Sequence, residues 1–450
     1  MPPRGASEGA VASLPPEILR MIIDYLAYNT PSLCACSLTC RSWYDAAAPY
    51  LHATLYSTIS LQDQKYEWPH PINSAQKLNF LPFVRDVRIC FMAGYAGHFS
   101  PWMFNPRHSI LSKFLSLVNV QSLELHKLNI PSFLPVIQQY FGHMFPTVQT
   151  LALKHPLGSK QHILYFVGSF PRLENLIFYD GAFDFWEEKP NSVPIPPSNP
   201  PLRGRLVIRD CVPPRFIEEM IRSFGGIRCR HLELHEVYGT RLLLSACAET
   251  LQSLRLDPTD PRGEYLGLRR AGFPTNNLVA WHTPQEFDLS QHKSLRSLEV
   301  PAITLNREWL DGLLDPPLRL FKYVLETVRS PDSFRLVVNY SEDSFRGIRT
   351  SQGPGKPSVL REKMSQEEIE EETSSHRNIF EVLRQARKVR DFSLTLRVTV
   401  SALVGEYGVQ TLKDTVAAEK VRGGFDEFSH EPVIEYQPCS PSIRFMSVLD

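Results

Sequence analysis

The stretch Val120-Gln121-Ser122-Leu123-Glu124-Leu125 decides the fold, because its apolar residues occupy positions one, four and six. Strand side chains alternate between two faces, so Leu123 and Leu125 point to one side. The signature recurs clearly in Val148-Leu151-Leu153, Leu173-Leu176-Phe178, Leu251-Leu254-Leu256 and Leu295-Leu298-Val300, and more weakly in Val84-Val87-Ile89, Arg203-Leu206-Ile208, Cys229-Leu232-Leu234 and Val389-Phe392-Leu394. One strand-forming unit is therefore predicted to repeat along most of the chain.

The spacing of the repeats indicates how the units stack. Fourth positions at 123, 151, 176, 206, 232 and 254 are 28, 25, 30, 26 and 22 residues apart. Helical patterns separate the strands in 132–145, 162–170, 215–224 and 241–248. The copies resemble irregular leucine-rich repeats, whose period is about 20 to 29 residues, although the usual Asn or Cys after the strand is missing. The expected fold is an α/β solenoid, and the sequence leaves its number of repeats and its curvature undetermined.

The residues between the buried leucines are predicted to line the concave face of the sheet and to bind a target protein. They are Glu124, His126, Lys154, Tyr179, Arg205, Arg209, His231, Glu233, His235, Arg255 and Asp257. Both charge signs with imidazole and Tyr suit a particular protein surface better than a uniform phosphate backbone. Alternatively these are ordinary solvated positions and a loop binds the target. Arg205, Arg209 and Arg255 could pair with phosphate on that target, and the sequence leaves this open.

Composition sets the remaining boundaries of the repeat region. Residues 56–349 are assigned to the solenoid, with an extended loop at Lys189–Pro201. Residues 350–375 read as a disordered acidic insertion, since Gly, Pro and Ser accompany the run Glu367–Glu372. That run could instead be a docking tail. Residues 376–450 form a C-terminal repeat or cap region, where 409–421 is helix-like.

The N-terminal segment has a different pattern. Residues 1–12 are expected to be disordered, and Ser13 is a plausible N-cap. Leu14, Ile18, Ile22 and Leu26 then recur every four residues along a helix. Ser32 is expected to cap a second helix, and a third is predicted from about Arg41 to a stop at Pro49. Three short helices in about forty residues rarely stand alone, so their apolar face needs a covering surface.

Residues 13–55 resemble an F-box of the form abundant in fungal proteins. The resemblance lies in Leu14-Pro15-Pro16-Glu17-Ile18-Leu19, Ile22-Ile23-Asp24-Tyr25-Leu26, Cys36-Ser37-Leu38-Thr39-Cys40-Arg41-Ser42-Trp43-Tyr44 and Ala48-Pro49-Tyr50-Leu51. It implies docking on a Skp-type adaptor through Leu14, Pro15, Ile18, Ile22, Leu26 and Leu38, with Trp43 inside the helical unit. Alternatively these helices only cover the end of the repeat array.

The expected function follows from this resemblance together with the repeats. The chain would be a non-catalytic substrate receptor of an SCF-type ubiquitin ligase, joining a target to the Skp-type adaptor and the cullin scaffold. The alternative is an interaction scaffold with no role in ubiquitination. The identity of the target cannot be read from the sequence.

Charge and cysteine usage narrow the partners and the compartment. Among 450 residues, 48 Lys and Arg balance 48 Asp and Glu, which favours a protein partner over nucleic acid or an anionic membrane. Eight Cys in mostly apolar stretches indicate buried thiols, and no apolar run has the length of a signal peptide or a membrane span. A cytoplasmic or nuclear location is expected.

Catalytic and metal-binding motifs are not found in the sequence. Neither a G-x-S-x-G elbow, a phosphate loop nor an H-E-x-x-H pair occurs. Cys34, Cys36 and Cys40 lack the spacing of a zinc knuckle and are expected to be small core residues. His231 and His235 flank Glu233 on one strand face, where contact with a target is favoured over metal. No enzyme activity and no cofactor are expected.

Overall fold

The computed structural model describes the main helices and strands of the chain. The described residues are 14–27, 29–59, 80–91, 117–128, 130, 145–156, 158–179, 201–209, 214–234, 240–256, 288–301, 323–329, 334–340, 379–388, 392–400, 413, 416–417 and 433–438. They fall into two compact units. The first is Met1–Leu173 with Phe183–Ile195, and the second is Glu174–Ala182 with Pro196–Asp450.

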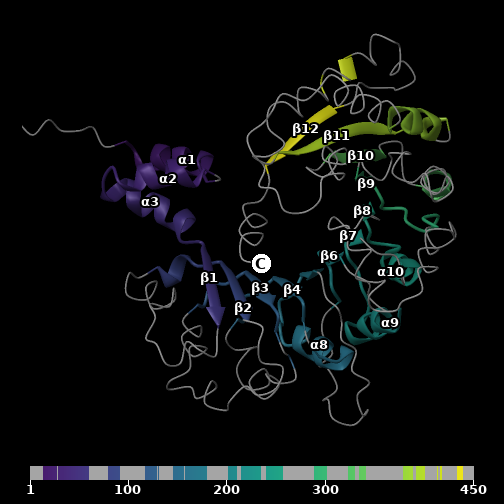
Figure 1. The fold of residues 1–450 in the computed structure, drawn as a ribbon, viewed down its shortest axis with the longest axis horizontal. Coiled ribbons are helices and arrows are strands. Elements are labelled where there is room, and N and C mark those ends of the chain that lie inside the picture. The colour runs from purple at the N-terminus through teal and green to yellow at the C-terminus, as the bar shows by residue number, and fades with distance from the viewer. Residues whose placement is uncertain are drawn as a thin grey trace, which may run out of the picture. The chain divides into compact units, whose positions relative to one another are not determined.

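The first unit begins with three helices, α1 (Pro16–Tyr25), α2 (Thr30–Ser37) and α3 (Arg41–Leu51) (Figure 1). Pro at the first position suits α1, because its missing N–H would have no partner there. Glu17 adds a negative charge to the positive end of the helix dipole. The N-cap residue is Pro15, which makes no side-chain cap, so the expected capping by Ser13 is wrong.

The ends of α2 and α3 also differ from expectation. Asn29 caps α2, since its side-chain oxygen accepts a hydrogen bond from the Ser32 N–H at 3.1 Å. Ser32 was predicted to hold this role, but it lies one turn too late. Helix α3 passes through Pro49 and ends at Leu51. The proline has no N–H to donate, but the His52 N–H still donates to the Ala48 carbonyl at 3.0 Å and closes the last turn.

A small apolar core joins the three helices. Leu19, Ile23, Leu33 and Ala47 are buried, and the partly buried Trp43 packs against them with Leu26, Cys36, Ala46 and Leu51. The prediction that Trp43 lies inside the helical unit is confirmed. Cys34 and Cys40 are exposed, so the expectation that all three neighbouring cysteines are core residues is wrong. The three helices therefore share only a small core within the described residues.

Four parallel strands follow in the first unit. They are β1 (Thr54–Ile59), β2 (Asp86–Phe91), β3 (Ser122–His126) and β4 (Thr150–Lys154), with the short 3-10 helix η2 (Leu81–Phe83) before β2 and α8 (Lys160–Val167) after β4. Leu55, Val87, Leu123 and Leu151 are aligned by the register into one buried row. His52, at the end of α3, stacks on Phe80 with ring centroids 3.4 Å apart. The helices and strands of this unit are thus in direct contact.

The second unit continues the parallel arrangement. Its strands are β5 (Asn175–Tyr179), β6 (Arg205–Ile208), β7 (His231–Leu234), β8 (Ser253–Leu256), β9 (Ser297–Pro301), β10 (Arg335–Tyr340), β11 (Ser393–Val400) and β12 (Val433–Pro438), each paired with the next. Helices α9 (Pro214–Ser223) and α10 (Thr240–Cys247) follow β6 and β7. The register aligns a second buried row through Leu176, Leu206, Leu232, Leu254, Leu298, Leu336 and Leu394.

The predicted α/β class is confirmed, and the structure adds that the strands pair in parallel, with two corrections to the predicted register. Position one of the β6 repeat is the buried Leu202, whereas the predicted Arg203 is exposed. In β11, Leu394 aligns with Leu336 at position four, so the predicted copy at Phe392 is two residues early. Strands β1, β10 and β12 were not predicted. The classification as leucine-rich repeats stays a prediction.

Several predicted segments lie outside the described residues. They are residues 1–12, the loop up to Pro200, the helical pattern of 132–144, the acidic insertion 350–375 and most of 409–421. Within the described part of the chain, no helix is long and apolar enough to cross a membrane.

Candidate functional site

An exposed apolar stripe runs along α1. Leu14 and Ile18 are 45% and 43% exposed, and Pro15 is exposed beside them. Ile22 and Leu26 are half-buried, because the same helix also faces the small core. Leu38, just after α2, is 86% exposed. The structure thus leaves four of the six predicted adaptor-binding residues exposed and covers two of them in part.

Two further exposed residues, which were not predicted from the sequence, extend the stripe. Met21 is 66% exposed and Tyr25 is 89% exposed. Each lies seven residues after a predicted contact, Leu14 and Ile18 respectively, which is two helical turns further along the same side. Both residues were predictable from the sequence, because apolar residues spaced by seven lie on the same side of a helix, as do those spaced by four. A row of large exposed apolar side chains on such a short helix marks an interaction surface.

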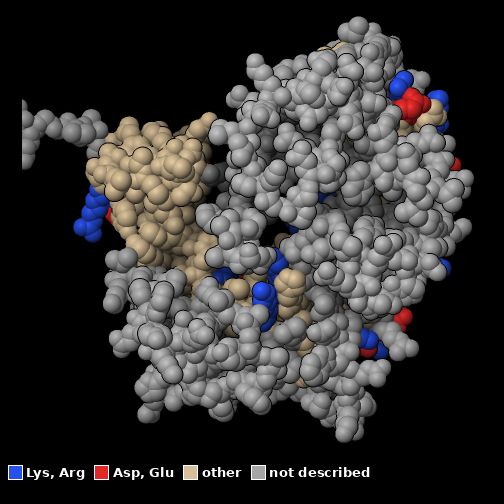
Figure 2. Space-filling view, in the orientation of Figure 1, with Lys and Arg blue, Asp and Glu red and all other residues tan. Residues whose placement is uncertain are grey.

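Charged groups also lie on α1, where Glu17, Arg20 and Asp24 are exposed. Figure 2 shows one face of the α1–α3 segment with few charged side chains. On α1, the Asp24 carboxylate accepts a hydrogen bond from the Tyr50 hydroxyl of α3. That bond, together with burial and the Asp24 charge, raises the pKa of Tyr50. The bond links α3 to α1 and gives the Asp24 carboxylate a hydrogen-bond donor within the helices.

The family comparison agrees with this geometry. A family model described as F-box-like matches residues 11–58, the segment that holds α1, α2 and α3. This match supports the interpretation of the chain as an F-box protein. No curated protein matches the chain.

The predicted target-binding residues of the first unit form a small polar network. The Glu124 carboxylate lies 3.1 Å from Nε of Arg88 and 2.6 Å from the buried ring of His126. Burial opposes ionisation of Glu124, but the His126 hydrogen bond and the Arg88 charge hold its pKa below the ordinary value. Lys154 is half-buried on β4 nearby and adds to this effect. The face is therefore polar and internally paired.

A larger ionic network lies on the corresponding face of the second unit. The side chain of Glu233 on β7 is only 3% exposed, and its carboxylate binds Arg205, together with Arg209 at 2.9 Å. Arg255 of β8 lies 4.0 Å from Glu233 and 3.1 Å from Glu299. The guanidinium of Arg209 also stacks over the Tyr179 ring at 4.9 Å. The structure thus brings five predicted target-binding residues together.

These contacts change what the strand face offers to a partner. The three arginines considered for phosphate binding share the carboxylate of Glu233, so a phosphate would have to compete with it. His231 stays exposed, and burial followed by the charges of Arg205 and Arg230 lowers its pKa. His235 and Asp257 lie outside the described residues. Among the residues that the structure describes, no group of three or more His, Cys, Asp or Glu side chains could hold a metal ion.

Proposed function

We propose that this protein is the substrate receptor of an SCF-type cullin ubiquitin ligase. The F-box-like match over residues 11–58 supports docking on a Skp-type adaptor. The observation that carries the proposal is the exposed apolar stripe of Ile18, Met21 and Tyr25 on α1, with Leu14 just before this helix and Leu38 just after α2. Covering such side chains releases about 25 cal/mol per Å² of apolar surface, which gives a partner surface a reason to bind there.

In this role the chain contributes position rather than chemistry. The adaptor and the cullin would hold the receptor near the subunits that transfer ubiquitin, and a target bound to the receptor would be presented to them. Holding two reactants together in this way raises their effective concentration. The protein would act in the cytoplasm or the nucleus.

We further infer that the strand-rich region is an array of irregular leucine-rich repeats that binds the target. Support comes from the regular rows of buried leucines and from the parallel pairing of successive strands. Arrays of this kind present long surfaces without a single deep site, which suits recognition of a protein.

The test is a pull-down of a Skp-type adaptor and a cullin by the intact chain and by a Leu14→Asp, Ile18→Asp variant. We expect the intact chain to recover both subunits. The variant should recover at least about tenfold less adaptor than the intact chain, because a charge in the apolar contact would have to be desolvated.

A matched control replaces two other exposed aliphatic residues by Asp. Val118 and Val433 are 58% and 55% exposed and lie outside α1–α3, so this variant should capture the adaptor normally. Capture by neither the intact chain nor the control would mean that the helices only cap the strand region. Capture of the adaptor without the cullin would favour a scaffold.

A further inference from the structure

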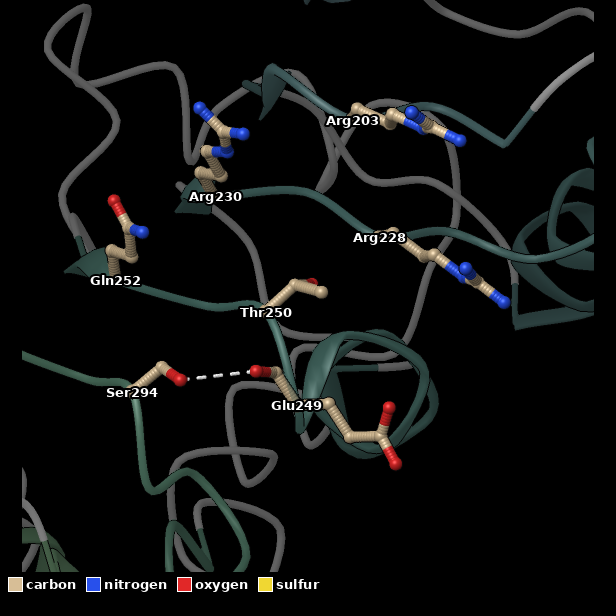
Figure 3. Close-up of a pocket in the computed structure, with 7 residues that line it drawn as sticks. All are labelled: Arg203, Arg228, Arg230, Glu249, Thr250, Gln252 and Ser294. Atoms are coloured by element: carbon tan, nitrogen blue, oxygen red, sulfur yellow. Dashed lines mark hydrogen bonds between the residues drawn. The ribbon is translucent and has the colours of Figure 1, made fainter.

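A polar cavity of about 410 Å³ lies at the amino ends of strands β6 to β9 in the second unit (Figure 3). Its lining consists of Arg203, Arg228, Arg230, Glu249, Thr250, Gln252 and Ser294. None of these residues belongs to the predicted target-binding face or to the helices α1–α3. The cavity is therefore a separate feature of the molecule.

The main chain fixes where these side chains begin. In a parallel sheet all strands start at the same edge, so residues that precede successive strands become neighbours. The N–H of Arg230 donates to the Gly204 carbonyl at 2.9 Å, and the N–H of Gln252 donates to the Arg230 carbonyl at 2.9 Å. The N–H of Arg228 donates to the Leu202 carbonyl at 2.8 Å. These bonds hold the three arginines on a rigid edge.

The cavity carries an excess of positive charge. Arg203, Arg228 and Arg230 are exposed, and none of their guanidinium groups forms an ion pair within the described part of the chain. Glu249 is the one acidic residue of the lining, and Figure 3 shows its carboxylate pointing away from the Arg230 guanidinium. The arginines of the strand face differ, since Arg205 and Arg209 bind Glu233.

The neutral residues of the lining add hydrogen-bonding groups beside the arginines. The hydroxyls of Thr250 and Ser294 donate to the main-chain carbonyls of Cys229 and Glu249 at 3.1 Å each, and each hydroxyl oxygen keeps the capacity to accept. The exposed amide of Gln252 has two N–H donors. The Gln252 amide therefore adds donors for anionic oxygens beyond the three guanidinium groups, whereas the two hydroxyl oxygens can accept from main-chain N–H groups of a bound peptide.

We infer that this cavity binds an acidic segment of a partner protein, with side chains of Asp or Glu paired to Arg203, Arg228 and Arg230. Arginine presents a planar fork that binds a carboxylate through two parallel hydrogen bonds. The inference rests on the proposed function only where it calls this partner the target of the receptor. Binding of an acidic segment to the cavity does not depend on the adaptor.

The arrangement of the guanidinium groups favours several carboxylates over one phosphate. In Figure 3, Arg203 and Arg228 extend in one direction, and the Arg230 guanidinium stands apart from both. Because Arg230 stands apart, the three groups do not enclose a single tetrahedral anion together, but they can pair with separate carboxylates along a peptide. A long nucleic acid is disfavoured as well, because three arginines next to Glu249 provide few phosphate contacts.

The test measures binding of a fluorescein-labelled hexaglutamate peptide to the full-length chain by fluorescence anisotropy. Replacing Arg203, Arg228 and Arg230 by Gln should weaken binding at least about tenfold, because three charge-assisted pairs are lost. The matched control replaces Arg172, Arg222 and Arg241 by Gln. These arginines are also exposed and do not line the cavity, so the same change in net charge should alter binding less than about twofold.

Two further probes of similar charge, a peptide with three phosphoserines and a seven-nucleotide oligothymidylate, should bind no tighter than hexaglutamate. Tighter binding of either probe would overturn the assignment to carboxylates. Equal weakening in both variants, or no binding of hexaglutamate to the intact chain, would overturn the site itself. Capture of the Skp-type adaptor by the cavity variant is measured in parallel, so a failure of the proposed function is recognised separately.

Discussion

At the scale of single residues, Glu233 is the centre of the ionic network on β7. Its carboxylate faces Arg205 on β6, Arg209 just after β6 and Arg255 on β8. Glu233→Gln should lower the free energy of unfolding by about 2 kcal/mol, because like charges would then face one another at a buried site. This is less than for a fully buried pair, since the Arg205 side chain is 48% exposed. Urea denaturation would measure it.

The control for this prediction is Glu218→Gln, which removes the same charge from an exposed position on α9. A loss below about 0.5 kcal/mol is expected there. Equal losses in the two variants would show that net charge, and not the network, stabilises the second unit.

A second residue, His292, should make stability depend on pH. Its ring is buried, Nε2 donates to the Leu244 carbonyl at 2.9 Å, and Nδ1 has no hydrogen-bond partner among the described residues. Burial lowers the pKa of His292, although the hydrogen bond to Leu244 and the Asp288 charge oppose this. Below the ordinary histidine pKa of about 6.5, the unfolded chain binds a proton that the folded chain does not. Stability should therefore fall between pH 7 and pH 5.5.

His292→Gln keeps a side-chain donor and removes the titrating ring, so it should lose less stability than the intact chain over this interval. The free energy of unfolding at pH 7 and at pH 5.5 measures the difference. His52 and His231 also have lowered pKa values and remain in both proteins, so only the difference between the two proteins reports on His292. An identical pH dependence would contradict the prediction.

At the scale of elements, the start of α2 depends on Asn29. Asn29→Ala should destabilise the helix by about 1 kcal/mol, because the Ser32 N–H loses its acceptor. Amide hydrogen exchange of residues 34–38 should then become about fivefold faster. Ser32→Ala is the matched control and should change the exchange little. A larger effect at Ser32 would mean that the helix starts later, as the sequence first indicated.

The elements also show what could be predicted from the sequence. The buried rows through Leu123 and Leu254 were predictable because the period of apolar residues is a property of the sequence itself. Capping of α2 was not, because Asn29 and Ser32 both carry suitable oxygen atoms and only the main-chain path selects one. The partner of Arg205 was equally hidden, since Glu233 lies 28 residues away and is brought close by the strand register.

The apolar stripe at α1 and the polar cavity of the second unit also differ in how well they could be predicted from the sequence. Leu14 and Ile18 were identified because an apolar pattern at helical spacing is visible in the sequence. The repeat pattern predicts Arg203 at the first position of a repeat, but Leu202 is buried at this position and Arg203 is exposed. Exposure of a charged residue at a strand edge depends on a shift of one residue, which a weak pattern does not determine.

At the scale of the whole molecule, adaptor docking and the stability of the strand region should respond to different substitutions. The helices have their own core around Leu19 and Ile23, whereas Leu298 lies in the leucine row of the second unit. Leu298→Ala should lower the free energy of unfolding by about 3 kcal/mol through the cavity that it creates, with adaptor capture unchanged below the unfolding transition.

The Leu14→Asp, Ile18→Asp variant should behave in the opposite way, losing adaptor capture while its urea midpoint stays within the error of the intact chain. Both side chains are nearly half exposed and lie near the positive end of the α1 dipole, which favours a negative charge, so the substitutions cost the folded state about 0.5 kcal/mol or less. If this variant instead unfolded as early as Leu298→Ala, the stripe would belong to a core that the chain covers itself. The helices would then be a cap on the strand region, and a different surface would have to bind the adaptor.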